Sequence, residues 1–317
     1  MLKLVYNEWI KIFKRVGTYV MIALVLIGVI GNGALTKYYE SKVQQPSNKE
    51  WRAGITQQIK ADEQNLKDLP KSEDKMKKYY EQKIEINQYR LDHNIPPSDQ
   101  SNGYTFISDN TMLISFVGLF TIIIAAGIVA SEFGWGTIKL LLIRPINRWK
   151  ILLSKYITVL LFGILLLAIL FASSVILGFI LFGTEGDHIH LAYSNGHVVE
   201  QNMILYLMKT YLLSSLDVIM LTTMAFMISA VFRNSSLAIG ISIFLLLMGG
   251  NVTALIAMKY EWAKYILFAN TNLMQYFDGT PLVSGMTLGF SIIMLLIYFV
   301  IFMLLAFGIF TKRDVAA

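Results

Sequence analysis

The sequence lacks cysteine entirely, and charged residues make up only 15% of its 317 positions. Without cysteine the chain cannot form a structural disulfide, use a thiol nucleophile, or hold a cysteine-ligated zinc or iron–sulfur site. Hydrophobic residues make up 55%, and the mean hydropathy is +0.56. These apolar side chains outnumber what the core of a soluble protein of this size can bury. The composition therefore excludes one or two ordinary globular domains and places the chain among membrane proteins.

Motifs for catalysis are also missing. The sequence has no G-x-x-x-x-G-K-[ST], and no glycine is followed by lysine, so the chain cannot build a phosphate-binding P-loop of its own. The zinc-protease motif H-E-x-x-H and the hydrolase motif G-x-S-x-G do not occur. We therefore expect no catalytic residues and no enzymatic activity in this chain.

Three of the 4 histidines lie together in one short segment, His188, His190 and His197, beside Asp187. This grouping invites a metal site. Metal ligands must converge on one point and need further side chains that orient them, which spacing alone does not provide. We expect a polar turn here and no metal site.

Six stretches are long and apolar enough to cross a bilayer, for which a helix needs about 20 residues. The predicted organisation is an N-terminal helix at 1–16, spans at 17–36, 110–131, 156–182, 208–232, 235–251 and 286–311, external segments at 37–109, 183–207 and 252–280, a cytoplasmic loop at 132–155 and a tail at 312–317. The predicted fold class is all-α: a polytopic membrane protein with six transmembrane helices, an N-terminal amphipathic elbow helix and an extracellular helical hairpin after the first span.

The distribution of lysine and arginine indicates the orientation, because short cytoplasmic loops hold the excess of basic residues. The basic residues cluster before the first span and after the second: Lys3, Lys11, Lys14, Arg15, Lys139, Arg144, Arg148, Lys150 and Lys155. The loop at 183–202 contains no lysine or arginine. We therefore expect both termini in the cytoplasm and a location in the cell membrane of a bacterium.

The first residues have the pattern of an amphipathic helix. Leu2, Val5, Trp9 and Ile12 recur at intervals of three and four, opposite a basic polar face. Two placements fit this pattern. The helix lies in the cytoplasmic interface as an elbow before the first span, which we favour, or it is the cytoplasmic end of a long first span.

The external segment 37–109 contains two helical stripes of apolar residues. The stripes consist of Trp51, Ile55, Ile59, Leu66 and Leu69, and of Met76, Tyr80, Ile84 and Leu91. Pro70 separates them, Ser72 is placed to cap the second helix, and Pro96–Pro97 ends it. Two antiparallel helices are predicted, acting either as a sensor of substrate or partner or as a shield over the outer mouth.

Asp217 is the ionisable residue well inside a predicted span, and an intramembrane carboxylate is by default a functional hypothesis. Thr210 and Ser214 share its helix face. Ser214 and Asp217 are therefore candidates for a cation or substrate contact in a central cavity. The alternative, which we favour, is a hydrogen-bonding group between helices.

The cytoplasmic loop 132–155 has an unusual composition for an interfacial loop. Glu132 closes the second span, Gly136 permits a turn, and Thr137 can cap a short helix that Pro145 ends. The apolar side of that helix consists of Ile138, Leu141 and Leu142. Arg148 then marks the return to the membrane. A short amphipathic helix at the cytoplasmic face is predicted, with an ordinary loop as the alternative.

This pattern resembles the ABC-2 type permease family of ATP-binding-cassette transporters. The matching positions in the loop are Glu132, Gly136, Thr137, Leu140, Leu141, Pro145, Arg148 and Lys155. The stretch Asn7-Glu8-Trp9-Ile10-Lys11 resembles the amphipathic helix that opens that family's permeases. The resemblance covers nearly the whole chain, except that segment 37–109 is longer than the family's usual outer loop.

The resemblance implies a transport subunit without its own ATPase. Two permease chains, identical or homologous, would pair in the lipid membrane, and each would dock a separate cytoplasmic P-loop ATPase that binds ATP and Mg. The chain itself would hold no cofactor and no nucleic acid. The loop residues Glu132, Gly136, Thr137, Ile138, Leu141, Leu142, Pro145 and Arg148 would form the ATPase-coupling site.

The resemblance also implies short helices that dip back from the outside between the last two spans. Gly249-Gly250-Asn251 would end the fifth span early, and residues 252–277 would supply these helices. The expected activity is movement, in the export direction, of a substrate such as a peptide antibiotic, a lipid-like compound or a drug.

Two other functions remain open on the sequence. The chain could be a secondary transporter that uses Asp217, or a membrane sensor or anchor that acts through the external hairpin. The Glu132–Lys155 pattern favours the transporter subunit. Neither alternative function needs a short docking helix preceded by Gly-Thr and followed by Pro-x-x-Arg.

Overall fold

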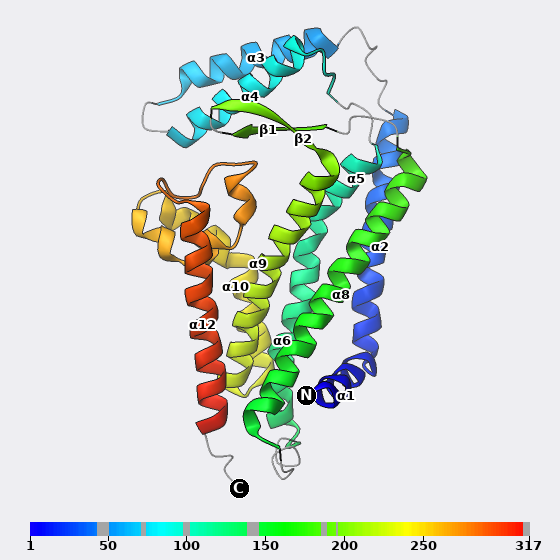
Figure 1. Cartoon of the computed structure of the whole chain (residues 1–317), viewed down its shortest axis with the longest axis vertical. Helices are drawn as coiled ribbons and strands as arrows, with labels where there is room; N and C mark the ends of the chain where they lie inside the picture. The colour runs from blue at the N-terminus through cyan, green and yellow to red at the C-terminus, as the bar shows by residue number, and fades with distance from the viewer. Residues whose placement is uncertain are drawn as a thin grey trace.

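Six long helices stand side by side in the computed structural model and account for most of its mass (Figure 1). The structure describes residues 1–42, 51–70, 74–97, 102–137, 146–184, 189–194 and 196–312. Within this part of the chain, 6 helices are long and apolar enough to cross a membrane. The expectation of a helical polytopic membrane protein is confirmed.

The six long helices are α2 (Val16–Lys42), α6 (Ile114–Gly134), α8 (Arg148–Phe182), α9 (Met203–Phe232), α10 (Ser235–Ala257) and α12 (Leu288–Lys312). Helices α2, α8, α9 and α10 are longer than the spans predicted for them, whereas α6 and α12 are each one residue shorter. Before α6, α5 (Gly103–Asp109) and a 3-10 turn, η1 (Asn110–Leu113), extend the second span outward. Charged residues mark where a helix leaves hydrocarbon, whereas its hydrogen bonding continues into the interface.

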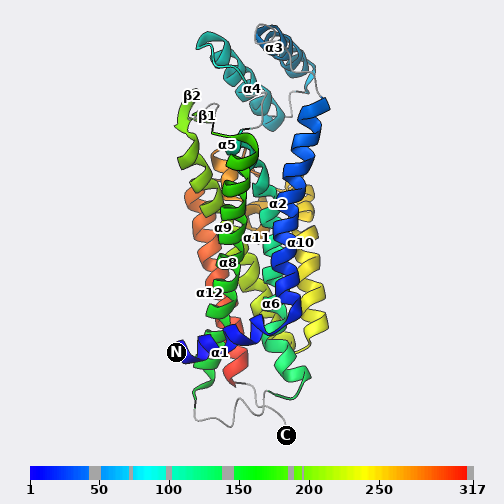
Figure 2. The same ribbon diagram turned by 90° about the vertical axis from the view of Figure 1, so that its right-hand side faces the viewer.

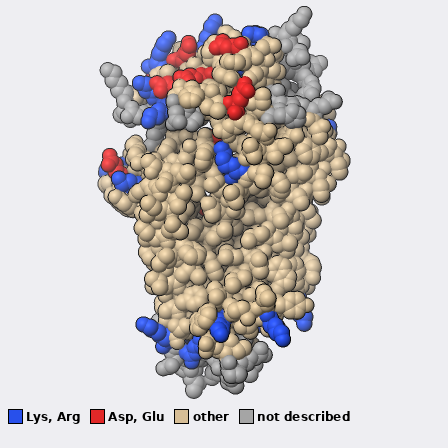
Figure 3. All heavy atoms as spheres, in the orientation of Figure 1, with Lys and Arg blue, Asp and Glu red and all other residues tan. Residues whose placement is uncertain are grey.

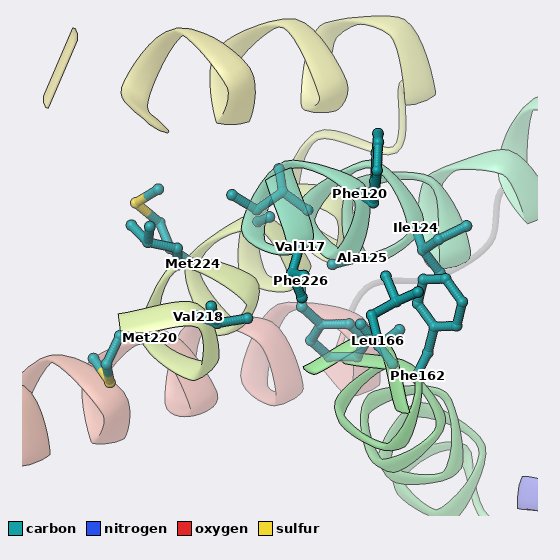
Figure 4. Packing of buried hydrophobic residues seen from close by; sticks show 14 of the residues in the cluster. Val117, Phe120, Ile124, Ala125, Phe162, Leu166, Val218, Met220, Met224 and Phe226 are labelled. Carbon is teal, nitrogen blue, oxygen red and sulfur yellow. The ribbon is translucent and has the colours of Figure 1, made fainter. Parts of the chain in front are cut away.

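Helices α6 and α9 form the centre of the bundle. In their most apolar stretches 67% and 61% of residues are buried, against 17% to 22% for the other four helices. Figure 4 shows Phe162 and Leu166 of α8 directed toward α6, with Phe226 of α9 beside them.

Helix α10 continues past the glycine pair at which we expected it to end. It runs to Ala257, and Gly249 and Gly250 lie inside it. A Cβ at Gly249 would lie 2.4 Å from the ring of Phe268. The glycine therefore permits close contact between α10 and the segment that follows, and the expected end of the helix at Asn251 is wrong.

Three short helical segments join α10 to α12: η2 (Glu261–Tyr265), α11 (Leu267–Asn270) and η3 (Leu273–Tyr276). The fully buried Asn270 donates to the backbone oxygens of Lys264 at 2.8 Å and Ile266 at 2.9 Å. Ser291 of α12 donates to the Asn270 side chain at 2.7 Å. Buried side chains thus satisfy the irregular backbone, which is the condition for such a segment near hydrocarbon.

At one end of the bundle, α3 (Trp51–Asp68) and α4 (Asp74–Asp92) pack against each other (Figures 1 and 2). Their shared core consists of Trp51, Ile55 and Ile59 with Ile84 and Leu91, all from the predicted stripes, whereas Met76 of the second stripe is 45% exposed. Ser72, the expected cap, lies outside the described residues.

A β-hairpin lies below these helices, where we expected only a polar turn. Strands β1 (Ile189–Ser194) and β2 (His197–Asn202) pair antiparallel, with Ser194 opposite His197. The two residues between the strands are Asn195 and Gly196, and Gly196 has φ +86°. Asn-Gly between β-rich segments is a strong hairpin signal, so the all-α prediction omitted this element.

At the opposite end, α1 (Leu2–Phe13) runs across the long helices (Figure 2). The turn into α2 is tight, and the Thr18 hydroxyl donates to the Ile12 backbone oxygen. The N-terminus and the end of α12 at Lys312 both lie at this end (Figure 1).

Candidate functional site: a buried charge cluster where α1, α6 and α8 meet

Four ionised side chains meet where α1 crosses α6 and α8. They are Glu8 and Lys11 of α1, Glu132 of α6 and Lys155 of α8. We call this group the charge cluster. Two carboxylates and two ammonium groups give it no net charge.

Lys155 is the centre of the charge cluster. Its Nζ atom lies 2.8 Å from Glu8 Oε2 and 3.0 Å from Glu132 Oε1, and its side chain is only 1% exposed. The Glu8 and Glu132 side chains are 7% and 11% exposed. Isolated charges so deeply buried would be very costly, and this mutual pairing offsets that cost.

Lys11 is the most exposed of the four side chains in the charge cluster. Its Nζ lies 2.8 Å from Glu8 Oε1 and 3.2 Å from Glu132 Oε1, and its side chain is 38% exposed. Burial alone would lower the pKa of Lys11, but the hydrogen bond and charge of Glu8, with the charge of Glu132, raise it above the ordinary 10.5. Lys11 therefore stays positive and contributes to the pairing up to strongly alkaline pH.

The arrangement follows from the pattern of α1. Glu8 and Lys11 are three residues apart, so both reach the same side of the helix. Glu8 and Ile12 are the buried residues of α1, whereas Leu2 is 86% exposed. The face of α1 that contacts the bundle is thus centred on Glu8 and Ile12. Of the predicted stripe, Ile12 is buried, Val5 and Trp9 are half-buried, and Leu2 is exposed.

The first residues of the cytoplasmic loop are tied to the charge cluster. The Thr137 hydroxyl donates a short hydrogen bond to the second carboxylate oxygen of Glu132. Gly136 allows the intervening turn with φ +70°, a conformation that glycine adopts without strain. This bond to Glu132 was not part of the expectation that Thr137 caps a helix.

The far end of the loop is also anchored. Arg148 opens α8, and its Nη1 lies 3.4 Å from the backbone oxygen of Thr311 at the end of α12. Ile138, Leu141, Leu142 and Pro145 lie outside the described residues, so the docking helix stays a prediction. The described parts of the loop show both of its ends fixed to the bundle.

The second candidate, Asp217, lies elsewhere on α9. The hydroxyl of Thr271, which follows α11, donates to the Asp217 carboxylate. Ser214 is one turn away on the same helix. The groove between α8 and α9 is lined by Ser215, Val218 and Thr222 instead. Asp217 therefore contacts the α11–η3 connection and does not face that groove.

Sequence reasoning named Lys155 only as a motif position and missed Glu8 and Lys11 as its partners. Glu8 and Lys155 are 147 positions apart, so no local spacing reports their contact. The sequence did contain one signal for this contact, because Glu8 is the single acidic residue before Glu40. An acidic residue on the apolar side of a basic helix indicates a buried partner.

Comparison with known proteins gives a family for this chain. Residues 76–316 match the family described as "Protein of unknown function (DUF2705)". The chain is 54% identical to the "Uncharacterized protein YhcI" of Bacillus subtilis (strain 168) over 319 aligned positions, which cover 100% of both chains. It is 34% identical to the "Uncharacterized membrane protein YdbK" of the same organism, over 70% of this chain and 87% of that protein. This six-helix membrane protein with a charge cluster at one end belongs to the DUF2705 family.

Proposed function

We propose that this chain is the membrane permease subunit of an ATP-binding-cassette transporter of the ABC-2 type. A separate cytoplasmic P-loop ATPase, which binds ATP and Mg, would dock on the loop 132–155 and drive export of the substrate. The single observation that carries the proposal is the charge cluster, because it joins the two ends of this loop to α1 and to two long helices.

The charge cluster supports a mechanical role for the loop. Glu132 precedes the loop on α6, Lys155 follows it on α8, and both bind Glu8 or Lys11 of α1. A displacement of the loop would therefore move α1, α6 and α8 together. Breaking one buried pair leaves an uncompensated charge, so the junction resists bending and transmits force to the central helix α6.

The placement of charges supports the orientation that this function requires. At the α1 end of the face in Figure 3, the coloured side chains are lysine and arginine, and acidic residues appear at the α3–α4 end. By the positive-inside rule, the α1 end would be cytoplasmic. Helix α1 would then be an elbow in the cytoplasmic interface, and α3, α4 and the β-hairpin would be extracellular.

The remaining parts of the proposal follow from the resemblance. Two copies of the chain, or this chain and a homologue, would form the substrate path, with the α10–α12 connection as the external re-entrant part. The expected substrate is a peptide antibiotic, a lipid-like compound or a drug. The bond between Asp217 and Thr271 supports a structural role for that carboxylate, and we therefore do not prefer a secondary transporter.

The experiment is purification of the tagged chain from the membranes of its own host in mild detergent. A P-loop ATPase should co-purify in stoichiometric amount, and its ATP hydrolysis should change when the complex is returned to lipid. Recovery of the chain alone, from cells in which its transport activity persists after ATP depletion, would contradict the proposal.

A further inference from the structure

A concave apolar surface runs along one side of α8, away from the charge cluster. One part lies between α1 and α8, has a volume of about 630 Å³, and includes Leu2, Tyr6 and Trp9. The other lies between α8 and α9 and has a volume of about 470 Å³. Ile164 and Ala168 line both parts. We call the joined surface the α8 groove.

Close packing of α8 on α6 creates this concavity. A Cβ at Gly163 would lie 3.1 Å from the Thr121 side chain of α6. The glycine therefore lets α8 approach α6, and Thr121 and Gly163 form the floor between α8 and α9. At the other side the lining comes from α1, which runs across α8 (Figure 2).

The length of the α8 groove matches half of a bilayer. On α8 its lining runs from Leu160 to Phe171. At about 1.5 Å of rise per residue this is roughly 16 Å, about half of the ~30 Å hydrocarbon thickness. The groove therefore extends from the level of α1 to about the middle of the membrane, which is the reach of an acyl chain in one leaflet.

Helix α1, which lines one part of the groove, has exposed basic residues on it and beside it. Lys3, Lys14 and Arg15 are exposed on or beside α1, and Lys3 follows directly on Leu2 of the lining. The acidic residue of α1, Glu8, is buried and paired with Lys155 and Lys11. The exposed charges of α1 are therefore basic, and Lys3 is the one that adjoins the lining of the groove.

We propose that the α8 groove binds an anionic phospholipid, with its headgroup at Lys3 and an acyl chain against Ile164 and Ala168. Lipid tails are as apolar as the side chains that line the groove, so the acyl chain contributes fit and little preference among lipids. Selection comes from the headgroup charge, to which each nearby lysine contributes about fivefold in affinity. This site does not depend on an ATPase or on transport.

The experiment uses the full chain in nanodiscs of equimolar phosphatidylcholine and phosphatidylglycerol, followed by native mass spectrometry of the lipids that stay bound. The wild-type protein should retain phosphatidylglycerol in preference to phosphatidylcholine. Lys3→Gln should lower the retained phosphatidylglycerol about fivefold, because it removes one charge from an exposed position. Ala168→Trp should fill the groove and lower the retention of both lipids.

Two matched controls separate this site from general membrane contact. Lys312→Gln removes a charge at the same end of the protein on α12, and Leu247→Trp adds a ring to the exposed face of α10. Both should retain lipid like the wild type. Equal retention of the two lipids by the wild type, or equal losses in Lys312→Gln and Lys3→Gln, would overturn the proposal. Neither result bears on whether an ATPase binds the cytoplasmic loop.

Discussion

The ammonium group of Lys155 lies 2.8 Å from Glu8, although 147 positions separate the two residues. This contact fixes the first helix of the chain to the start of α8, at the point where the cytoplasmic loop returns to the membrane. Glu132 shares the same ammonium group at 3.0 Å. The three elements that frame the loop are therefore joined through one buried nitrogen atom.

Replacement of Lys155 should be strongly destabilising. Lys155→Met would leave the partly exposed Lys11 as the remaining described cation beside Glu8 and Glu132, and removing one partner of a buried ion pair costs about 3–5 kcal/mol. Adding Glu8→Gln to this variant should recover part of the loss, because it removes one unpaired carboxylate. Denaturant unfolding in mixed micelles measures the free energy of unfolding of the single and the double variant. Lys11→Met, at a 38% exposed position, should cost much less, and an equal cost would show that burial is not the cause.

Acid pH should weaken the contact between the β-hairpin and the α10–α12 connection. Burial would raise the pKa of Asp278, but hydrogen bonds from His190 and Tyr206 and the charges of His190 and Lys209 hold it below its ordinary 3.8. The ionised carboxylate therefore contributes stability above pH 3.8, and this contribution is lost as the pH falls through the lower folded value.

The variant Asp278→Asn tests this dependence. Its thermal midpoint in detergent should be below that of the wild type at pH 6, and the two should converge below about pH 3.8, the ordinary pKa of the carboxyl group. The control Glu261→Gln changes an exposed carboxylate of the same connection. A difference between Asp278→Asn and the wild type that persists unchanged at pH 3 would exclude the carboxylate as its cause.

Long-range contacts set the limit of what the sequence could predict. The six spans followed from runs of about 20 apolar residues, and α3 and α4 followed from their stripes, because both signals are local. Lys155 and its two partners come from three elements that meet only after the helices pack. The close approach of Gly249 to Phe268 is also tertiary, which is why a glycine pair inside α10 was misinterpreted as its end.

The β-hairpin is a different case, because its signal was present and local. Asn195-Gly196 stands between segments that contain Ile189, Val198 and Val199. We interpreted this histidine-containing segment as a polar turn instead. In the structure His190 stacks on Tyr206 with 3.6 Å between ring centroids and lies 3.3 Å from Asp278. Among the residues that the structure describes, no three histidine, aspartate or glutamate side chains lie close enough together to hold a metal ion.

Cysteine labelling should establish the orientation. The chain has no native cysteine, so Lys78→Cys in α4 and Lys14→Cys after α1 each provide a single reactive group at an exposed position. A membrane-impermeant maleimide added to intact cells should label Lys78→Cys, and Lys14→Cys should react only after the membrane is opened. The reverse pattern would invert the proposed orientation and remove the loop 132–155 from the cytoplasm.

Removal of the charge at Asp217 should leave assembly intact. Asp217→Asn keeps the shape of the side chain and can still accept a hydrogen bond from Thr271. We expect near-normal yield and thermal stability with a modest change in transport. Thr271→Val, which removes the donor, should be more destabilising than Asp217→Asn because the carboxylate loses its partner. Complete loss of transport in Asp217→Asn, with assembly and ATPase binding preserved, would instead support a substrate or ion site.

The cytoplasmic loop gives the most direct test of the proposed function. If Ile138, Leu141 and Leu142 fill an apolar groove on an ATPase, Leu141→Asp places a carboxylate in that contact. Burying an unpaired carboxylate costs several kcal/mol, and each 1.4 kcal/mol is tenfold in affinity. The variant should insert and dimerise normally, because the change lies outside the spans, but it should lose the co-purifying ATPase and substrate-stimulated ATP hydrolysis. Lys139→Ala, on the polar side of the predicted helix, should have a much smaller effect. Full ATPase binding by Leu141→Asp would show that this loop is not the docking element, and the charge cluster would then only stabilise the fold.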